Sequence, residues 1–424
     1  MGDDHCRQLS GPGELWWRLA SGPTFTDDTV HGTSMTNATA ESAYLARQRR
    51  VLIYIPHLLP VYQPWARHHA QLLPRFETML AGRKRAVPTL DIEGIAHFSL
   101  DAFPFGKLEG SILLINGRGP RLERAIAAFA PDLIHAHFAT SATEIMDIAN
   151  RLDVPLVVTY HGWDSRISSS TQPLRPYDRL HLARRERMFD QAALILTVSE
   201  WLRQEVVALG ADEKKTEVHY LGVDRQVFDG IRSSDGSSRV AMVGRLVRLK
   251  GTHFALEAFR LLLPRVSGLT VEIIGDGPER AALERTVAEF GLPVSFLGAQ
   301  SQEETRNLLA RSRVLCFPST VTEGLSAEKF GLAAAEAQAM GVPVVGAKTG
   351  GIPEAFKQGE TGLLVPDANP EALAEALHVL LTEDAVHARM SSAGRALVAE
   401  KFDVRKNLGV LADRYDTLLD ALGR

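Results

Sequence analysis

At 424 residues the chain is too long for a single hydrophobic core, while its 45% hydrophobic and 23% charged residues are ordinary for a soluble globular protein. A net charge of -4 excludes the basic field of a protein that grips nucleic acid. Two cysteines, Cys6 and Cys316, exclude a disulfide framework, and no apolar run reaches the length of a bilayer span. Because the polar start does not resemble a signal peptide, we expect a cytoplasmic protein.

The amino-terminal half begins with a polar segment. Residues 1–47 are rich in Ser, Thr, Gly and Asp without sustained periodicity, which predicts a disordered tail. Apolar runs rich in β-branched residues then predict buried strands, and helical stretches fall between them. The predicted strands are 51–56, 133–138, 156–162 and 194–199, and the predicted helices are 120–129, 142–152 and 177–191. This alternation is typical of a parallel sheet with helices on both faces.

The same pattern restarts after a linker-like segment that ends in Gly, Ser and Asp. The predicted strands are 240–246, 271–277, 294–298, 314–319, 343–347 and 362–366, and the predicted helices are 251–264, 278–290, 302–311, 331–340 and 370–381. Two consecutive α/β sets predict two doubly wound, Rossmann-like domains, 48–228 and 229–403, before a final helix within 404–424. Ligands of such sheets bind at the carboxyl ends of the strands, which predicts a site in the cleft between the domains.

A pair of cations follows the first strand of the second domain. In GRLVRLKG (244–251), Arg245 and Lys250 leave the strand end within one loop, so both can converge on one anion. Diphosphate is the natural partner, because Arg binds it through two parallel donors and Lys as a point charge. Two solvated surface charges are the alternative. In IIGDGPER (273–280), Gly275 begins a tight turn that suits a nucleotide or a plain strand-to-helix connection.

The densest motif is EGLSAEKFGLAAAEAQAMGVPVV (323–345). A helix is predicted from about Gly331 to Gly341, so Glu328 precedes it and Glu336 lies about a turn and a half inside it. The first turn of this helix offers unpaired backbone N–H groups to phosphate oxygens, and Gly331 has no side chain to block a ligand. TGGIPE (349–354) permits close backbone approach, although a simple turn remains an alternative.

These segments resemble the retaining GT-B glycosyltransferases of family 4, group 1, which build bacterial glycans, lipopolysaccharides and exopolysaccharides. The resemblance spans 50–424, and its motifs in order are GRLVRLKG, IIGDGPER, FLG, EKFGLAAAE, AMGVPVV, GGIPE and GETGLLVP. It implies two domains facing across a cleft, with the final helix packed back on the first domain. The implied reaction is transfer of a hexose-type sugar from a nucleotide-diphosphate sugar to a saccharide or polyprenyl-linked acceptor in cell-surface polysaccharide biosynthesis, without a cofactor.

The resemblance also implies roles for the donor-side residues. Arg245 and Lys250 hold the diphosphate, Glu328 contacts hydroxyls of the transferred sugar, and Glu336 accepts hydrogen bonds from the ribose. The remaining donor-side positions are Gly331 and Leu332, which offer backbone N–H groups, and Gly275.

This chain departs from the family pattern directly after the first glutamate. The family has Gly there and this chain has Lys329, which puts the shape of the sugar pocket in question. Glu323 and Gly324 resemble the start of the same motif, but only Glu328 has the right spacing to Glu336.

The acceptor side is predicted from HGWD (161–164). His161 emerges at the carboxyl end of a strand, and in the family the matching histidine lies beside the reacting sugar; a structural histidine is the alternative. Asp164 either orients a ligand hydroxyl or caps a helix. His135 and His137 in HAHF share one face of a strand with metal-like spacing, but no further ligand cluster is evident in the sequence, so no metal site is predicted.

The candidate catalytic residues are Glu328, His161, Arg245 and Lys250. No Asp-x-Asp stands in a suitable loop, so Arg245, Lys250 and the helix start are expected to stabilise the leaving diphosphate without a metal. In the front-face mechanism that the resemblance implies, the leaving phosphate helps to remove the acceptor proton, and no protein general base is assigned.

Five arginines within 175–189 predict either a solvated helix face or attraction to anionic lipid headgroups. Because acceptors in the family are often lipid-linked, peripheral contact with the cytoplasmic face of the inner membrane is expected.

Two other functions fit the same architecture. A nucleotide-sugar epimerase would release nucleotide and a changed sugar without an acceptor, and a non-catalytic nucleotide-sugar binding protein is encouraged only by Lys329. A glycan phosphorylase would need a pyridoxal-phosphate lysine and a much longer chain.

Overall fold

The computed structural model describes residues 47–58, 63–86, 92–169, 174–229, 238–322 and 327–424. Residues 48–424 form a compact unit of their own. Apart from Arg47, the expected tail lies outside the described residues, and so do Glu323 and Gly324.

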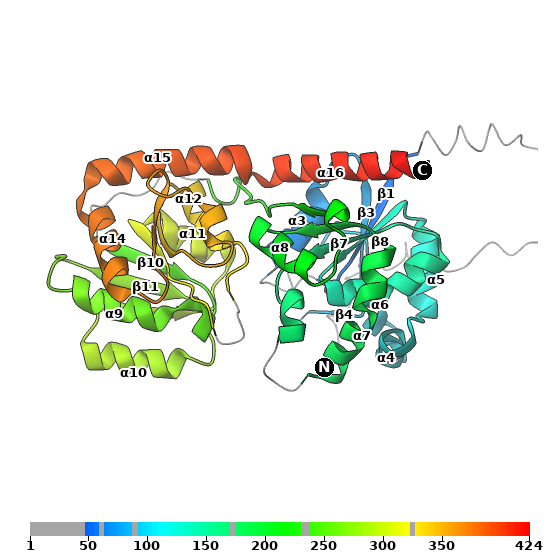
Figure 1. Cartoon of the computed structure of the whole chain (residues 1–424), viewed down its shortest axis with the longest axis horizontal. Helices are drawn as coiled ribbons and strands as arrows, with labels where there is room; N and C mark the ends of the chain where they lie inside the picture. The colour runs from blue at the N-terminus through cyan, green and yellow to red at the C-terminus, as the bar shows by residue number, and fades with distance from the viewer. Residues whose placement is uncertain (1–46, 59–62, 87–91, 170–173, 230–237, 323–326) are drawn as a thin grey trace, which may run out of the picture. The chain divides into compact units, whose positions relative to one another are not determined.

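A parallel sheet of seven strands forms the core of the amino-terminal half (Figure 1), in the order β5-β3-β1-β6-β7-β8-β9. Its strands are β1 (Arg50–Tyr54), β3 (Glu77–Gly82), β5 (His97–Ser99), β6 (Leu133–His137), β7 (Leu156–Tyr160), β8 (Ala192–Thr197) and β9 (Thr216–Val218). The strand order reverses between β1 and β6, which makes that edge the topological switch point where such sheets bind ligands.

Helices connect these strands, because parallel neighbours need a crossover of a dozen or more residues. They are α3 (Pro64–Leu72), α4 (Gly106–Asn116), α5 (Pro120–Phe129), α6 (Ala139–Arg151), α7 (Pro176–Gln191) and α8 (Glu200–Ala208). A short parallel pair, β2 (His57–Leu58) and β4 (Lys84–Arg85), lies beside this sheet.

The carboxyl-terminal half repeats the design with the six-stranded order β12-β11-β10-β13-β14-β15, so its switch point lies between β10 and β13. The strands are β10 (Arg239–Val243), β11 (Thr270–Ile274), β12 (Val294–Gly298), β13 (Val314–Phe317), β14 (Val344–Ala347) and β15 (Gly362–Val365). The helices are α9 (Thr252–Leu262), α10 (Arg280–Phe290), α11 (Gln302–Ala310), α12 (Leu332–Ala339), α13 (Ile352–Ala355), α14 (Pro370–Thr382) and α15 (Asp384–Lys401).

The two sheets confirm the predicted fold class, and every strand and helix predicted above is present with small shifts at its ends. Several elements between residues 57 and 119 were not predicted. Strand β3 (ETMLAG) has one β-branched residue, so its strand propensity is weak. It is a strand because it pairs in parallel register with β1 on one side, from Arg50 to Tyr54, and with β5 on the other.

The final helix α16 (Val404–Ala421) lies against the amino-terminal half. Its buried apolar stripe includes Leu408, Leu411 and Leu419, and the Tyr415 hydroxyl lies 2.5 Å from Nδ1 of His135 on β6. Arg49 adds a charged contact just before β1, with a hydrogen bond of 2.6 Å to Asp416. The helix thereby ties the end of the chain to the first sheet.

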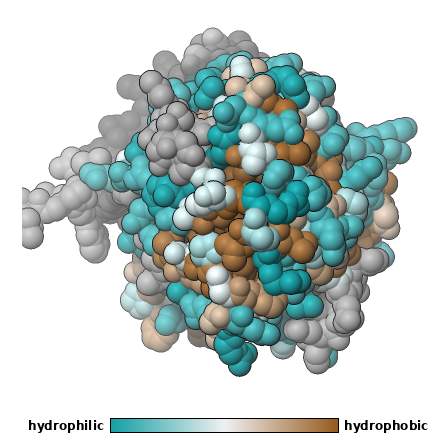
Figure 2. Space-filling model, turned by 90° about the vertical axis from the view of Figure 1, so that its left-hand side faces the viewer, coloured by the Kyte–Doolittle hydropathy of each residue, from teal (hydrophilic) through white to brown (hydrophobic). Residues whose placement is uncertain are grey.

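Hydrophobic and hydrophilic side chains intermingle on the end of the structure that carries α9, α10 and α14 (Figure 2). Among the described residues, no helix combines the length and apolar character that a bilayer span requires.

Candidate active site

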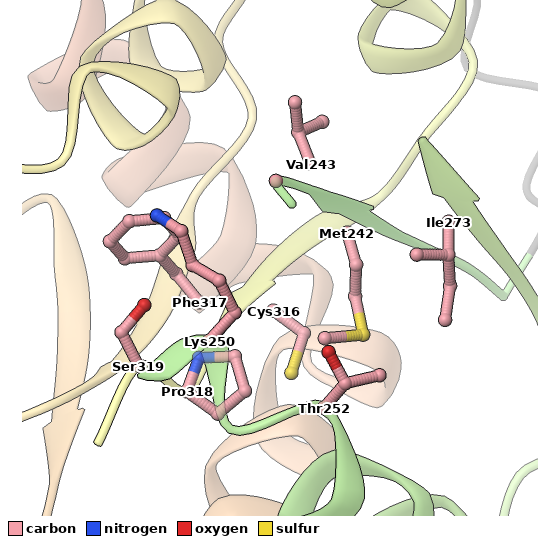
Figure 3. A pocket seen from close by; sticks show the side chains of 10 residues that line it. Met242, Val243, Lys250, Thr252, Ile273, Cys316, Phe317, Pro318 and Ser319 are labelled. Carbon is pink, nitrogen blue, oxygen red and sulfur yellow. The ribbon is translucent and has the colours of Figure 1, made fainter. Parts of the chain in front are cut away.

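A pocket lies at the switch point of the carboxyl-terminal sheet, beside the ends of β10 and β13 (Figure 3). In it, the side chain of Lys250 runs along the ring of Phe317, with Nζ 5.2 Å from the ring centroid. The lining residues are Met242, Val243, Gly244, Lys250, Thr252, Ile273, Cys316, Phe317, Pro318 and Ser319. The predicted cation Lys250 therefore stands at the edge where an open α/β sheet binds its ligand.

Lys250 and Glu328 are in direct contact. Lys250 Nζ donates to Oε2 of Glu328 at 2.5 Å, and the Ser319 hydroxyl donates to the same oxygen at 3.3 Å. The loop of the TGGIPE motif supports this arrangement, because Gly351 N–H donates to the Glu328 carbonyl at 2.8 Å. A cation that lines the pocket and a carboxylate are thus held together, the residue types that bind a phosphate and a sugar hydroxyl respectively.

Arg245 differs from Lys250. It is exposed, and within the described part of the chain its guanidinium has neither an ion pair nor a hydrogen bond. The two cations leave the same loop as predicted, but only Lys250 is held, by Glu328, while Arg245 is unengaged among the described residues. An unengaged guanidinium keeps all five donors available to an anion.

The turn at Gly275 packs against the turn that carries Arg245. Gly275 has φ 141°, and a Cβ there would lie 1.8 Å from the carbonyl oxygen of Gly244. Because it has no side chain, this glycine allows the two βα turns to touch. Its contribution to the predicted donor site is therefore to the path of the backbone.

Helix α12 carries the second half of the EKFGLAAAE motif. Gly331 is its N-cap with φ 95°, and a Cβ there would lie 2.9 Å from the ring of Phe317. Leu332 begins the helix, so its backbone N–H has no acceptor within the helix. Glu336 is half-buried, and its carboxyl has no hydrogen bond within the described residues. Burial raises the pKa of this carboxyl to about 7.

Glu336 should give the protein a measurable pH dependence. Since its folded pKa of about 7 exceeds the usual 4.5, the folded state keeps a proton that the unfolded chain releases between these values. The stability that this group contributes is therefore complete below about pH 4.5 and is lost as the pH rises to about 7. We expect Glu336→Gln to abolish this fall, a difference of about 1–3 kcal/mol in urea unfolding between about pH 5 and about pH 8. An unchanged pH slope in the variant would contradict the assignment.

Glu354, the last residue of TGGIPE, contacts helix α8. Its carboxylate accepts the backbone N–H groups of Glu200 at 2.7 Å and Trp201 at 2.9 Å, and the Tyr220 hydroxyl at 2.9 Å. A carboxylate on the first N–H groups of a helix is favourable because it satisfies unpaired donors at the positive end of the helix dipole. This motif joins the two halves as well as supporting Glu328.

Lys329, where the family has Gly, is buried. Its Nζ donates to Oε2 of Glu205 on α8 at 2.7 Å and lies 4.2 Å from the ring centroid of Trp201. Its stem packs on Gly162 of the HGWD motif, where a Cβ would lie 2.0 Å from Lys329 Cγ. The departure from the family pattern is accommodated by contacts with the first half of the chain.

His161 lies at the switch-point edge of the amino-terminal sheet. Its ring stacks on Trp65 with 4.0 Å between centroids, and its Nε2 lies 3.0 Å from Nδ1 of His137. Burial lowers the pKa of His161 to about 3, so the imidazole is neutral at physiological pH. It can exchange hydrogen bonds with a ligand but brings no positive charge.

Asp164 is buried and fully used by the backbone. Its two oxygens accept N–H groups of Ala139, the first residue of α6, at 2.7 Å and of Gly162 at 2.8 Å. This geometry matches the capping alternative and fixes the loop that carries His161.

The fold brings His69 of α3 next to His135 and His137, all three of them buried. The sequence contained no signal for this third histidine, since its neighbours in the chain resemble no ligand motif. Ser319 was also missed, although it contacts Glu328 only nine residues along the chain, and Trp65 was missed because it acts through His161, far away in sequence.

Two family models match successive parts of the chain. The model described as "Glycosyltransferase Family 4" matches residues 100–227, and the model described as "Glycosyl transferases group 1" matches residues 224–397.

Two relatives illustrate the similarity. The amylovoran biosynthesis glycosyltransferase AmsK of Erwinia amylovora is 29% identical over 65% of this chain and 67% of its own length. The D-inositol 3-phosphate glycosyltransferase of Mycobacteroides abscessus is 32% identical over 61% of each chain. The matched region is thus 67% of the first relative and 61% of the second.

Solved structures are similar in fold. Anabaena HepE in complex with UDP and glucose is 21% identical, with a TM-score of 0.69 over 86% of this chain and 99% of HepE. The sucrose-phosphate synthase of Thermosynechococcus elongatus is 20% identical, with a TM-score of 0.70 over 88% of this chain and all of the synthase.

Proposed function

The chain belongs to the GT-B glycosyltransferases, and from this premise we propose that it transfers a sugar, with retention, from a nucleotide-diphosphate sugar to a saccharide or polyprenyl-linked acceptor. Relatives named for amylovoran and colanic acid biosynthesis support a role in making a cell-surface polysaccharide. The HepE structure with UDP and glucose supports a uridine nucleotide as the first donor to test.

The observation that carries the proposal is the contact of Lys250 with Glu328 beside the start of α12, at the switch point of the second sheet. In the proposed complex the diphosphate lies between Lys250, Arg245 and the N–H groups at Leu332. Glu336 receives the ribose, and Glu328 receives hydroxyls of the sugar. Fixed charges and dipoles of this kind stabilise a leaving group without reorganising during the reaction.

The proposed transfer needs no protein base. The acceptor oxygen forms a bond to the anomeric carbon on the face from which the diphosphate departs, and the carbon–oxygen bond to the diphosphate breaks with both electrons going to the leaving oxygen. The acceptor proton passes to that leaving phosphate. Neutral His161 lies on the acceptor side as a hydrogen-bonding group for the sugar.

A panel of nucleotide sugars, followed by thermal shift and by nucleotide release, tests this function. A ligand at 100 times its dissociation constant stabilises the fold by about 2.7 kcal/mol. Acceptor-dependent nucleotide release supports the transferase. Sugar conversion without an acceptor would indicate an epimerase, and binding without release would indicate a non-catalytic protein.

Transfer should persist after chelation, because Lys250 and Arg245 take the place of a bridging metal. Enzyme treated with EDTA and assayed in the transfer reaction should gain no rate from added Mg²⁺ or Mn²⁺. A loss that Mg²⁺ or Mn²⁺ restores would contradict this, since these hard ions are the ones that bind diphosphate oxygens.

We further propose that helix α4 carries a membrane-facing surface, because five large apolar side chains are exposed on it and just before it, from 38% to 79%. Four of them recur at helical spacing on one face. The five are Phe103, Phe105, Leu108, Ile112 and Ile115. Apolar side chains concentrated in this way mark an interaction surface more often than chance exposure does.

The arginine-rich helix α7 lies against the end of α4 (Figure 1). Arg184 of α7 donates to the carbonyl groups of Leu114 at 3.0 Å and Ile115 at 2.6 Å, and Arg175 and Arg179 are exposed. An apolar helix face next to exposed cations has the chemistry of a peripheral contact with anionic lipid. Such a contact would bring the enzyme to a lipid-linked acceptor.

Replacing Phe105 and Ile115 together by Ser should lower binding to phosphatidylglycerol vesicles more than about tenfold, since each buried apolar side chain contributes about 1.5–3 kcal/mol. Co-sedimentation measures this, and Val410→Ser, at an exposed apolar position of α16, is the matched control. Equal vesicle binding by the double variant and the control would contradict lipid binding by this surface. A concentration-dependent dimer that the double variant abolishes would instead make the surface a contact between copies of the protein.

A further inference from the structure

Three buried histidine rings meet beneath the acceptor side. The ring centroids of His135 and His137 on β6 are 4.2 Å apart, and the ring of His69 on α3 lies 4.8 Å from His137 and 5.8 Å from His135. One ring nitrogen from each residue can be chosen so that all three lie within 4.8 Å of one another. Residues 66 positions apart are thus brought to one point by α3 packing beside the switch-point edge.

Two of these rings have a nitrogen without a partner. His69 Nδ1 and His137 Nε2 are buried and form no hydrogen bond with the described residues, although the residues are only 4% and 0% exposed. Buried polar atoms of folded proteins are nearly always satisfied, so an unsatisfied nitrogen on each of two neighbouring rings indicates a partner that binds there. No carboxylate belongs to the group that the described residues form.

We propose that His69, His135 and His137 form a zinc-binding site. Imidazole nitrogens select Zn²⁺ and neighbouring transition metals over Mg²⁺ and Ca²⁺, which prefer oxygen. Zn–N bonds of about 2.0–2.1 Å in a tetrahedral arrangement place the nitrogens about 3.4 Å apart, so the rings close by roughly an ångström around the ion.

The third ligand, His135, brings its own outer support. Its Nε2 lies 2.7 Å from the Thr159 hydroxyl and its Nδ1 lies 2.5 Å from the Tyr415 hydroxyl. Whichever nitrogen binds the ion, the other keeps a hydroxyl partner, the arrangement that orients metal-bound histidines in general. With Nε2 of His135 on the ion, Nδ1 keeps Tyr415 of α16, so the ion would also fix the contact that attaches the final helix.

The site also reaches the acceptor side. With Nε2 of His137 on the ion, its Nδ1 carries the proton and donates to Nε2 of His161, 3.0 Å away. That bond leaves the remaining proton of His161 on Nδ1. The ion would therefore be a positioning device for His161, with no part in binding diphosphate.

Metal content tests the site independently of sugar transfer. Full-length protein is stripped with a chelator, refilled with Zn²⁺ or Co²⁺ and passed through a desalting column. We expect about one retained ion per chain, a visible Co²⁺ absorption band and a raised melting temperature. His69→Gln should lose these signals, while His68→Gln, at the neighbouring histidine outside the cluster, should keep them.

Retention of less than about a tenth of an ion by refilled wild type, or equal retention by His69→Gln, would overturn the proposal. The second result would assign the ion elsewhere, for example to His5 or His31, which lie outside the described residues. Far-UV circular dichroism of the metal-free variants tests whether each is folded. If His69→Gln is not folded, the Co²⁺ spectrum of the wild-type protein still decides the proposal.

Discussion

Glu328→Gln should lower kcat about 100-fold or more while changing the donor KM only slightly. The carboxylate is held by Lys250 at 2.5 Å and by Ser319 at 3.3 Å, in position to face a sugar that becomes oxocarbenium-like. An interaction that strengthens as charge develops contributes mainly to the transition state, so its loss appears in kcat. Loss of one such fixed group typically costs a factor of about 10² to 10³.

Steady-state kinetics of three variants separate this role from a structural one. Glu336→Gln should chiefly raise the donor KM, because the ribose does not change during the reaction. The control is Glu323→Gln. Glu323 is a glutamate of the same motif at the wrong spacing to Glu336, so its replacement should leave the kinetics close to wild type. Near-normal turnover by Glu328→Gln with a wild-type melting temperature would remove the main support for the proposed chemistry.

Replacing both cations of the GRLVRLKG loop should weaken nucleoside diphosphate binding by at least about 100-fold and leave nucleoside binding nearly unchanged. Hydrogen bonds to charged groups are each worth about 1.5–3 kcal/mol, which is about 10- to 100-fold per residue. Titration calorimetry of Arg245→Ala, Lys250→Ala and the double variant with both ligands measures the effect.

The two single variants should differ in kind. Arg245 is unengaged among the described residues, so Arg245→Ala removes only phosphate contacts. Lys250→Ala also frees Glu328, so it should lower kcat as well as affinity. Arg248→Ala, at an exposed arginine of the same loop, is the matched control. Equal losses for nucleoside and diphosphate would show that the loop acts through stability and not through phosphate.

The sequence by itself determined the two sets of strands and helices and the placement of the motifs on them. These features depend on local patterns, since an apolar β-branched run forms a buried strand and glycine marks where a strand turns into a helix. Glu328 before α12 and Glu336 inside it follow from the spacing along one segment. The weak strand β3 escaped prediction because its stability comes from pairing with β1 and β5, which lie on its two sides.

Only the tertiary structure decided which of these residues meet. Lys250 and Glu328 are 78 positions apart, and Glu354 and Glu200 are 154 positions apart. Their contacts depend on strand order and on how far each crossover reaches, which local periodicity does not encode. The same reason explains why His69 lies beside His135 and His137. A helix and a strand that are distant in the chain pack together at one edge of the sheet. Two of the histidine nitrogens buried there have no hydrogen-bond partner among the described residues.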